Sequence, residues 1–427
     1  MIFFRVTNSI NIKITDGSIL KYDRFKAPVN IENETVYITT YDDFQDLKEI
    51  FAKVDKNRYS AKVVNEDSVR DIQSFPIELG VSFKGEQKLR YEIGDISFLE
   101  LKEQELLNNL KSFHKSSIKV AVIGSLGDTI SKMISSMAAL RIFYEKLKEI
   151  YKNVDLDIFI KASNNSYFNR DKSIYQTQKY INNIYPLSTN TKAFCQYDYF
   201  VDNSIDISKN LDINIVDAWL YKFGIDYKKV NNLNKYSEIN IDNFELTKDL
   251  KNQIEKAKKR GKLLLFHPYS ASINKSIPQN FAIEILKALI DKLDDYIIVS
   301  TLLIDPKIKS DNFVDLSSYS KTIEDFIYIV SSMDKVLTAE TSALHIADSF
   351  MIPTLCISTN DDENIMKYYK NTKSIFVKDS SKNLSKFIYE NDLLTINKFE
   401  EWKKLKIEDI IKILESFWYN KTLNFNK

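Results

Sequence analysis

The sequence predicts an α/β protein in which two halves built on parallel sheets follow a β-rich N-terminal segment. From residue 118 onward, continuous apolar runs typical of strands buried on both faces alternate with stretches of helical periodicity. A charged, glycine-free stretch at 231–260 separates two such series. Before residue 113, apolar and polar residues alternate around turn formers, which is the pattern of half-buried strands. These observations favour two βαβ units behind an accessory domain.

The length of 427 residues is too great for one compact core and indicates two or three domains. We expect a β-rich accessory domain, two Rossmann-like domains and a C-terminal docking helix. The boundaries expected for these four parts are 1–112, 113–245, 246–400 and 401–427.

Composition limits the classes of partner. Basic residues number 60 and acidic residues 59, so the formal net charge of +1 gives no overall field that would attract nucleic acid or an anionic membrane.

We expect no signal peptide, because the start MIFFRVTNSINIK lacks a lysine-first region and a small-residue cleavage site. No window reaches about 18 uninterrupted apolar residues, and the only cysteines are Cys195 and Cys356. We therefore expect a cytoplasmic protein with no nucleic-acid partner and at most peripheral contact with the inner face of the cytoplasmic membrane.

The N-terminal segment is expected to contain strands in three stretches, at 11–25, 34–43 and 74–101. Gly85 and Gly94 mark turns within the last stretch, and a helix over 103–114 leads into the next unit.

The first βαβ series begins with the apolar run IKVAVIG at 118–124, which indicates a buried strand. Further strands are expected at 154–161 and 197–203, and Gly224 is expected to stop a short helix. A long helix over 129–151 is predicted because apolar residues recur at helical spacing: Ile130, Met133, Ile134, Met137, Leu140, Tyr144, Leu147 and Tyr151.

The second series opens with a helix over 246–260, and Gly261 lies beyond its end. Strands and helices then alternate, which predicts four or five parallel strands. Strands are expected at 262–268, 296–302, 335–340, 354–359 and 374–378, and helices at 278–293, 322–333 and 341–350. Thr322 and Asp325 are placed to cap one helix. The last helix, at 407–418, is expected to dock through one apolar face, formed by Ile410, Ile411, Leu414 and Trp418.

Three strand ends carry residues suited to binding or catalysis, since ligands bind beyond the carboxyl ends of strands in open α/β sheets. In VIGSLGDTI, Gly124 and Gly127 permit a tight turn and close approach of a ligand. Asp128 is either the N-cap of the following helix or a general base. The segment lacks the three-glycine dinucleotide fingerprint, which argues against an NAD-linked oxidoreductase.

The second segment is FHPYSASINKSIP. Ser270, Ser272 and Lys275 lie on a loop that precedes the helix opening at Pro278. Hydroxyls and a lysine near a helix N-terminus are suited to a diphosphate. The alternative is that Lys275 is an ordinary solvated lysine in a lysine-rich chain.

The third segment is AETSALHIADSFMIP. Thr341 or Ser342 is expected to cap a helix, whose first amides, from Ser342 to Leu344, would then face an anion. His345 lies one turn further on and is either a ligand contact or a hydrogen-bonded core histidine.

Together and in this order, the three segments resemble glycosyltransferase family 9, the ADP-heptose heptosyltransferases of lipopolysaccharide synthesis. The resemblance covers about residues 118–378, and its most specific part is the spacing of Thr341, His345, Ala347 and Pro353. It implies a GT-B fold, in which two Rossmann-like domains face a cleft, the first binding the acceptor and the second the donor nucleotide.

The resemblance also implies roles for individual residues. Asp128 would be the catalytic base, Lys275 would pair with the donor diphosphate, and Glu340 would hydrogen-bond hydroxyls of the donor sugar. The full set of donor-binding positions is Gly127, Ser270, Ser272, Glu340, Thr341, Ser342, Ala343 and His345. No metal ligand or cofactor is implied, and the Asp155-Leu156-Asp157 run is interpreted as structural. A family branch binds iron through several cysteines, a site that two unclustered cysteines do not provide.

Three positions depart from the family pattern: Glu340 replaces its Asp, Ser342 its Gly and Ile277 its Trp. These changes leave the donor sugar open, with heptose as one candidate. We expect an inverting, metal-independent transfer from a nucleotide-diphosphate sugar to a hydroxyl of a glycan, lipid-linked glycan or protein. The alternative is a non-catalytic, sugar-nucleotide-binding scaffold of a glycosylation complex. The N-terminal domain would recognise a large acceptor or contribute to an oligomer.

Overall fold

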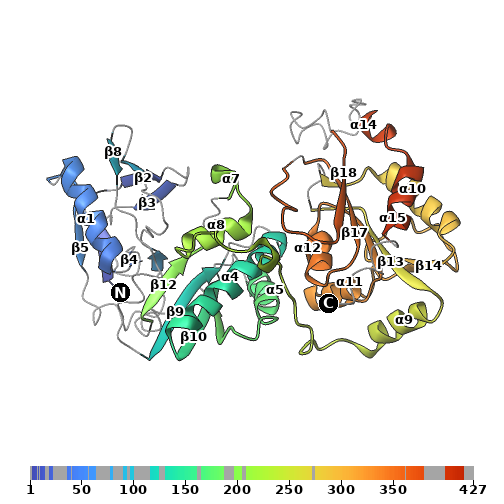
Figure 1. Ribbon diagram of the computed structural model, residues 1–427, viewed down its shortest axis with the longest axis horizontal. Coiled ribbons are helices and arrows are strands. Elements are labelled where there is room, and N and C mark those ends of the chain that lie inside the picture. Colours follow the sequence, from blue (N-terminus) through green and yellow to red (C-terminus); the bar gives the residue numbers. More distant parts are fainter. Residues whose placement is uncertain are drawn as a thin grey trace, which may run out of the picture. The chain divides into compact units, whose positions relative to one another are not determined.

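The computed structural model of the chain divides into two compact units, Met1–Lys235 and Tyr236–Lys427, and each is described by itself (Figure 1). The division falls before the expected boundary at 245/246. The structure describes residues 2–6, 8, 10–14, 19–22, 36–39, 41–55, 57–63, 77–79, 90–93, 97–100, 116–124, 130–160, 165–186, 197–203, 208–271, 275–360, 362–378 and 400–417.

The first part of unit 1 is rich in β-structure, as predicted, and its described residues form two four-stranded sheets. One has the order β5 (Ala61–Val63), β1 (Ile2–Val6), β4 (Val36–Thr39) and β6 (Ile77–Leu79). The other has the order β3 (Ile19–Tyr22), β2 (Ile10–Ile14), β7 (Arg90–Ile93) and β8 (Ser97–Glu100), all antiparallel. The turns expected at Gly85 and Gly94 and the helix expected at 103–114 lie outside the described residues.

A helix that the sequence analysis missed, α1 (Tyr41–Asp55), follows β4. Its Phe44, Leu47 and Phe51 share one face at helical spacing and are buried. The ring of Phe44 lies 5.3 Å from that of Phe4 on β1. The alternation read across 34–43 therefore ends earlier than expected, and the chain becomes helical from Tyr41 onward.

The rest of unit 1 is a parallel sheet with Rossmann-like alternation. Its strand order is β11 (Asn183–Pro186), β10 (Asn153–Ile160), β9 (Ser117–Gly124) and β12 (Tyr199–Asp202). The helices are α4 (Ile130–Ile150), α5 (Asn165–Tyr175), α7 (Ser208–Leu211) and α8 (Ile215–Lys222), with a short 3₁₀ turn at Asn232–Asn234. Phe143 of α4 stacks on Phe223 at 4.1 Å, and Gly224 ends α8 with a positive φ of 69°.

The described residues of unit 2 form a six-stranded parallel sheet with flanking helices, one strand more than the largest number expected. The order is β15 (Phe313–Asp315), β14 (Tyr296–Ser300), β13 (Lys262–His267), β16 (Lys335–Ala339), β17 (Thr354–Ser358) and β18 (Thr372–Phe376). The additional strand, β15, spans three residues and is too short to give an apolar run. The helices are α9 (Lys248–Lys258), α10 (Gln279–Lys292), α11 (Ile323–Ser331), α12 (Ser342–Ser349), α14 (Glu400–Lys403) and α15 (Ile407–Ser416).

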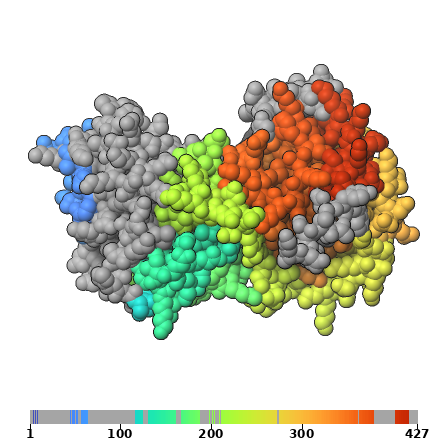
Figure 2. All heavy atoms as spheres, viewed as in Figure 1, coloured from blue at the N-terminus to red at the C-terminus, as the bar shows by residue number. Residues whose placement is uncertain are grey.

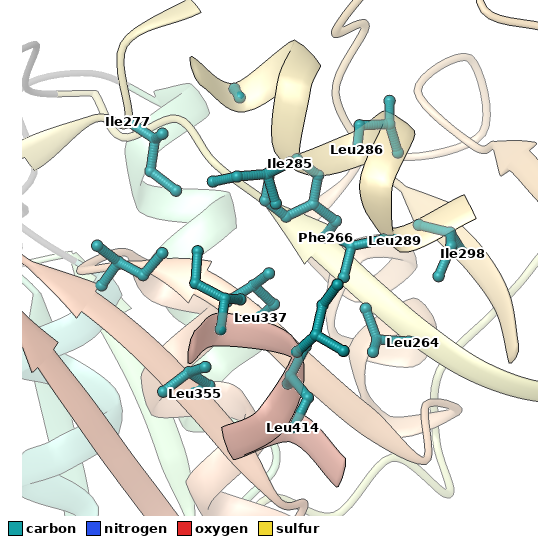
Figure 3. Close-up of a cluster of buried hydrophobic side chains, with 14 of the residues drawn as sticks. Leu264, Phe266, Ile277, Ile285, Leu286, Leu289, Ile298, Leu337, Leu355 and Leu414 are labelled. Atoms are coloured by element: carbon teal, nitrogen blue, oxygen red, sulfur yellow. The ribbon is translucent and has the colours of Figure 1, made fainter. Parts of the chain in front are cut away.

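One hydrophobic core cluster of unit 2 lies between the sheet and two of its helices, α10 and α15 (Figure 3). Strand residues such as Leu264 and Leu337 meet Ile285 and Leu289 of α10. The predicted docking of the last helix is confirmed, because Ile410, Ile411 and Leu414 are buried; Trp418 lies outside the described residues. In the space-filling view of Figure 2, the orange segment that includes α12 and β17 forms part of the visible face of this unit.

Candidate functional site

The candidate site lies at the carboxyl edge of the unit 2 sheet. His267 ends β13 and pairs in register with Thr338 on β16, and Ala339 pairs with Ile357 on β17. Because the strands are parallel, the segments that follow them emerge at the same edge. Two of the three motifs found in the sequence leave the sheet here.

The turn from β16 into α12 is held by hydroxyl groups. Thr341 is the N-cap, and its Oγ1 accepts a hydrogen bond from the Ala343 amide at 3.1 Å. The Leu344 amide donates to the Thr341 carbonyl at 3.1 Å. The hydroxyls of Thr338 and Thr341 are themselves 3.1 Å apart. An incoming anion would therefore compete with Thr341 for the Ala343 amide, whereas Ser342, at the first helical position, has no intrahelical acceptor for its amide.

Hydrogen bonds join the two ends of the loop that follows β13. The Ser270 amide donates to Ser276 Oγ at 2.9 Å, Ser276 Oγ donates to the Ser270 carbonyl at 3.2 Å, and the Ile277 amide donates to the Pro268 carbonyl at 2.9 Å. These bonds return the chain to the sheet edge just after Lys275. Ser272 lies outside the described residues.

Lys275 and Glu340 are in direct contact. The Lys275 ammonium donates to Glu340 Oε1, and their side chains are 41% and 5% exposed. The sequence analysis gave these residues separate ligand partners, phosphate and sugar, and did not foresee that they pair with each other. Lys275 is thus partly exposed to solvent, as in the alternative of an ordinary solvated lysine, but its charge also faces a nearly buried carboxylate.

Glu340 also accepts a hydrogen bond, at 3.3 Å, from the hydroxyl of Ser358 at the end of β17. Sequence analysis missed Ser358, although its position at the end of the run TLCIS was a usable signal under the rule that ligands gather at strand ends. Burial raises the pKa of the neighbouring Cys356 thiol, and the negative charge of Glu340 raises it further. This buried thiol therefore stays protonated and unreactive at ordinary pH.

His345 is buried, and its Nδ1 is hydrogen-bonded to the hydroxyl of Tyr369. Burial lowers the pKa of His345 to about 3, and the nearby charge of Lys275 contributes. The imidazole is therefore neutral at ordinary pH. Its geometry matches the alternative of a hydrogen-bonded core histidine.

His267 plays a comparable part at the end of β13. Its Nδ1 lies 2.9 Å from Thr301 Oγ1, and its carbonyl accepts a hydrogen bond from Thr338 Oγ1 at 3.1 Å. Burial lowers the pKa of His267 to about 4. The neutral ring thus links the end of β13 to the residue that follows β14, and the His267 carbonyl links it to β16.

Asp348 lies on α12 three residues after His345 and is 3% exposed. In the described part of the chain, its Oδ1 has no hydrogen-bond partner. Burial raises the pKa of this carboxyl to about 7, although the Lys370 backbone amide, which donates to it, and the Lys370 charge act in the opposite direction. No sequence signal identified this residue.

The carboxyl edge of the unit 1 sheet is described only in part. A Cβ added to Gly124 would lie 2.8 Å from the Tyr175 hydroxyl, so this glycine makes room for a packed tyrosine. Nearby, Asn203 is 1% exposed, and neither Oδ1 nor Nδ2 of its side chain has a hydrogen-bond partner in the part of unit 1 that the structure describes. Gly127 and Asp128 lie outside the described residues, so the assignment of Asp128 as base stays a prediction.

Asp157, from the D-x-D run, is buried inside β10, where Tyr197 Oη donates to it at 2.5 Å and Asn183 Nδ2 at 3.1 Å. Among the described residues, no group of three or more His, Cys, Asp or Glu is arranged to hold a metal ion. Nor is any helix in the described ranges long and apolar enough to cross a membrane.

No protein-family model matches the chain, and no curated protein matches its sequence. Solved structures do match. A glycosyltransferase family 9 protein from Veillonella parvula is 11% identical, with 70% of this chain and 97% of that one covered and a TM-score of 0.50. The E. coli ADP-heptose lipopolysaccharide heptosyltransferase II is also 11% identical, with 71% and 100% covered and a TM-score of 0.50. This chain shares their fold.

The likeness confirms the expected α/β fold class with GT-B architecture. A bacterial iron-containing dodecameric glycosyltransferase from enterotoxigenic E. coli is 8% identical, with 97% of this chain and 92% of that one covered and a TM-score of 0.46.

Proposed function

We propose that the chain is an inverting glycosyltransferase that moves a sugar from a nucleotide-diphosphate donor to an acceptor hydroxyl. The observation that carries the proposal is the pairing of Lys275 with Glu340 at the carboxyl edge of the unit 2 sheet, beside the N-terminus of α12. A nucleotide sugar needs a cation for its diphosphate and an acceptor for its hydroxyls, and this edge holds one of each. The fold shared with glycosyltransferase family 9 structures supports the same class.

On the donor side, the Lys275 ammonium and the Ser342 amide would contact the diphosphate, with the dipole of α12 adding to the attraction. These groups meet the negative charge that the leaving nucleotide gains as its bond to the sugar breaks. Glu340 would accept hydrogen bonds from hydroxyls of the donor sugar. Since Lys275 and the helix terminus supply the positive charge, the scheme requires no divalent metal.

On the acceptor side, we assign Asp128 as the base. The acceptor oxygen forms a bond to the anomeric carbon while the bond from that carbon to the diphosphate oxygen breaks, and the nucleotide leaves with the electron pair. Asp128 takes the hydroxyl proton late, when the attacking oxygen has become acidic, so a carboxylate of ordinary basicity is sufficient. A glycan, a lipid-linked glycan or a protein would serve as acceptor, and heptose remains one candidate for the sugar.

A thermal-shift screen of the full chain against ADP-, GDP-, UDP- and CDP-linked sugars tests donor binding. Incubation with the donor that binds then tests for hydrolysis and for transfer to added acceptors. Asp128→Asn should lower turnover at least 100-fold, within the usual range for loss of a general base, and should keep donor binding. Turnover close to that of the unaltered protein would remove Asp128 from the mechanism.

A second candidate function is a non-catalytic scaffold that binds sugar nucleotides. Its support is that Glu340 already neutralises Lys275, which would weaken the hold on a leaving diphosphate. Donor binding with no release of sugar from any bound donor would favour the scaffold over the enzyme.

A further inference from the structure

We propose that Glu340 is a specificity-determining residue that makes the site favour sugar-bearing nucleotides over bare nucleoside diphosphates. The inference rests on the proposed function, because it concerns the same donor site. It follows from the contact between Lys275 and Glu340, which joins the group expected to bind phosphate to the group expected to bind sugar.

The two partners differ in how much they depend on the contact. The Lys275 side chain is 41% exposed and retains access to water when it leaves Glu340. The Glu340 side chain is 5% exposed, and among the described residues its one hydrogen-bond partner besides Lys275 is the neutral hydroxyl of Ser358, at 3.3 Å. A buried carboxylate that loses its cation is strongly destabilised unless new hydrogen bonds replace the contact.

A bare nucleoside diphosphate therefore faces a conflict. If its phosphates draw Lys275 away, Glu340 is left buried without a cation and beside further negative charge. The neighbouring side chains give little relief, since Cys356 is a buried thiol, Ser358 is neutral, and His345 is neutral and hydrogen-bonded to Tyr369. If Lys275 stays with Glu340, the phosphates lose their cation. Either way, binding is weakened.

A nucleotide sugar resolves the conflict because it brings hydroxyl donors with it. Lys275 can transfer to the diphosphate while sugar hydroxyls donate to the Glu340 oxygen that Lys275 leaves. The buried carboxylate then keeps its hydrogen bonds, and the exchange costs less than with a bare nucleotide. The same asymmetry would favour release of the nucleotide product once the sugar has been transferred.

The test measures dissociation constants by calorimetry on the full chain, with three matched probe pairs: ADP with ADP-glucose, GDP with GDP-mannose, and UDP with UDP-glucose. For the pair that binds, Glu340→Gln should tighten binding of the bare nucleotide about tenfold, which corresponds to about 1.4 kcal/mol. It should leave binding of the sugar nucleotide unchanged or weaker, so the preference for the sugar form falls at least tenfold. Glu255→Gln, which removes the charge of an exposed glutamate on α9, is the matched control and should change neither constant.

Two variants separate the possible failures. Lys275→Met should weaken both ligands, and adding Glu340→Gln to it should give a smaller gain for the bare nucleotide than Glu340→Gln gives alone, because only the charge repulsion is relieved and no cation remains to be released. If Glu340→Gln shifts both ligands equally, or weakens the bare nucleotide, the specificity role is overturned while the donor site stands. If neither these probes nor any nucleotide sugar of the thermal-shift screen binds the unaltered protein, or if Lys275→Met binds as well as it, the donor site itself is wrong and both proposals fail.

Discussion

Gly124 ends β9 under the side chain of Tyr175. A Cβ at this position would lie 2.8 Å from the tyrosine hydroxyl, a separation that real Cβ atoms essentially never show, and 3.2 Å from two ring carbons, so the buried ring would have to shift. Gly124→Ala should therefore lower the free energy of unfolding by about 1–3 kcal/mol, as overpacking of a core does. Chemical denaturation measures the change. In a chain that already carries Tyr175→Leu, Gly124→Ala should lower the free energy of unfolding by less. An alanine variant as stable as the unaltered protein would show that the tyrosine moves aside freely.

The buried carboxyl of Asp348 gives the stability a pH dependence with a definite sign. Its folded-state pKa of about 7 lies above the ordinary value of 3.8, so the folded state keeps a proton that the unfolded state releases. The associated stability is fully present below about pH 4 and is lost as the pH rises towards 7, by at most about 1.4 kcal/mol per pH unit. Asp348→Asn removes this loss.

The free energy of unfolding of Asp348→Asn minus that of the unaltered protein should thus be larger at pH 8 than at pH 4. Paired denaturation curves at the two pH values check the prediction. The exposed Asp294, changed to Asn, controls for the loss of a charge. A gain of the same size at both pH values would contradict a proton held at Asp348.

The start of α11 shows how far local sequence rules extend at the scale of an element. The capping box predicted from Thr322 and Asp325 is present: the Asp325 amide donates to Thr322 Oγ1 at 3.1 Å, and the Thr322 amide donates to Asp325 Oδ2 at 3.1 Å. Both partners lie within one turn of chain, so their spacing alone defines the geometry.

Thr322→Ala should lower the free energy of unfolding by about 1 kcal/mol, the usual cost of losing an N-cap hydroxyl. Thermal or chemical denaturation measures the loss. Lys321→Ala is the matched control, since Lys321 contacts Asp325 through its backbone amide, which the substitution keeps. Equal stability of the threonine and lysine variants would argue against the cap.

Other elements were predictable only where their pattern was long or strongly periodic. The apolar runs of β9, β13 and β16 identified these strands because they are buried on both faces. β15, with three partly exposed or exposed residues, has no such run and is defined by its pairing with β14. α1 was missed although Phe44, Leu47 and Phe51 share a helical face, because the alternating residues just before it favoured a strand.

At the scale of the whole molecule, the candidate site depends on segments far apart in sequence. Lys275, Glu340 and Ser358 come together because parallel strands deliver their carboxyl ends to one edge of the unit 2 sheet. The sequence predicted that a site would lie at this sheet edge, and it predicted Lys275 and Glu340 as members of the site. It did not predict their contact, because side-chain reach depends on where each loop returns to the sheet. Nor did it suggest Tyr369, which meets His345 from a segment without a recognisable pattern.

Diphosphate binding by Lys275 in unit 2 is the interaction on which the proposed function depends most. Calorimetric titration of the full chain with ADP-glucose, GDP-mannose and UDP-glucose, beside the same titrations of Lys275→Met, tests it directly. The account predicts that at least one of the three binds the unaltered protein and that Lys275→Met weakens its binding about tenfold or more, as expected when a charge-assisted phosphate contact is removed. Equal affinity of the two proteins for that ligand, or no binding to either, would contradict it.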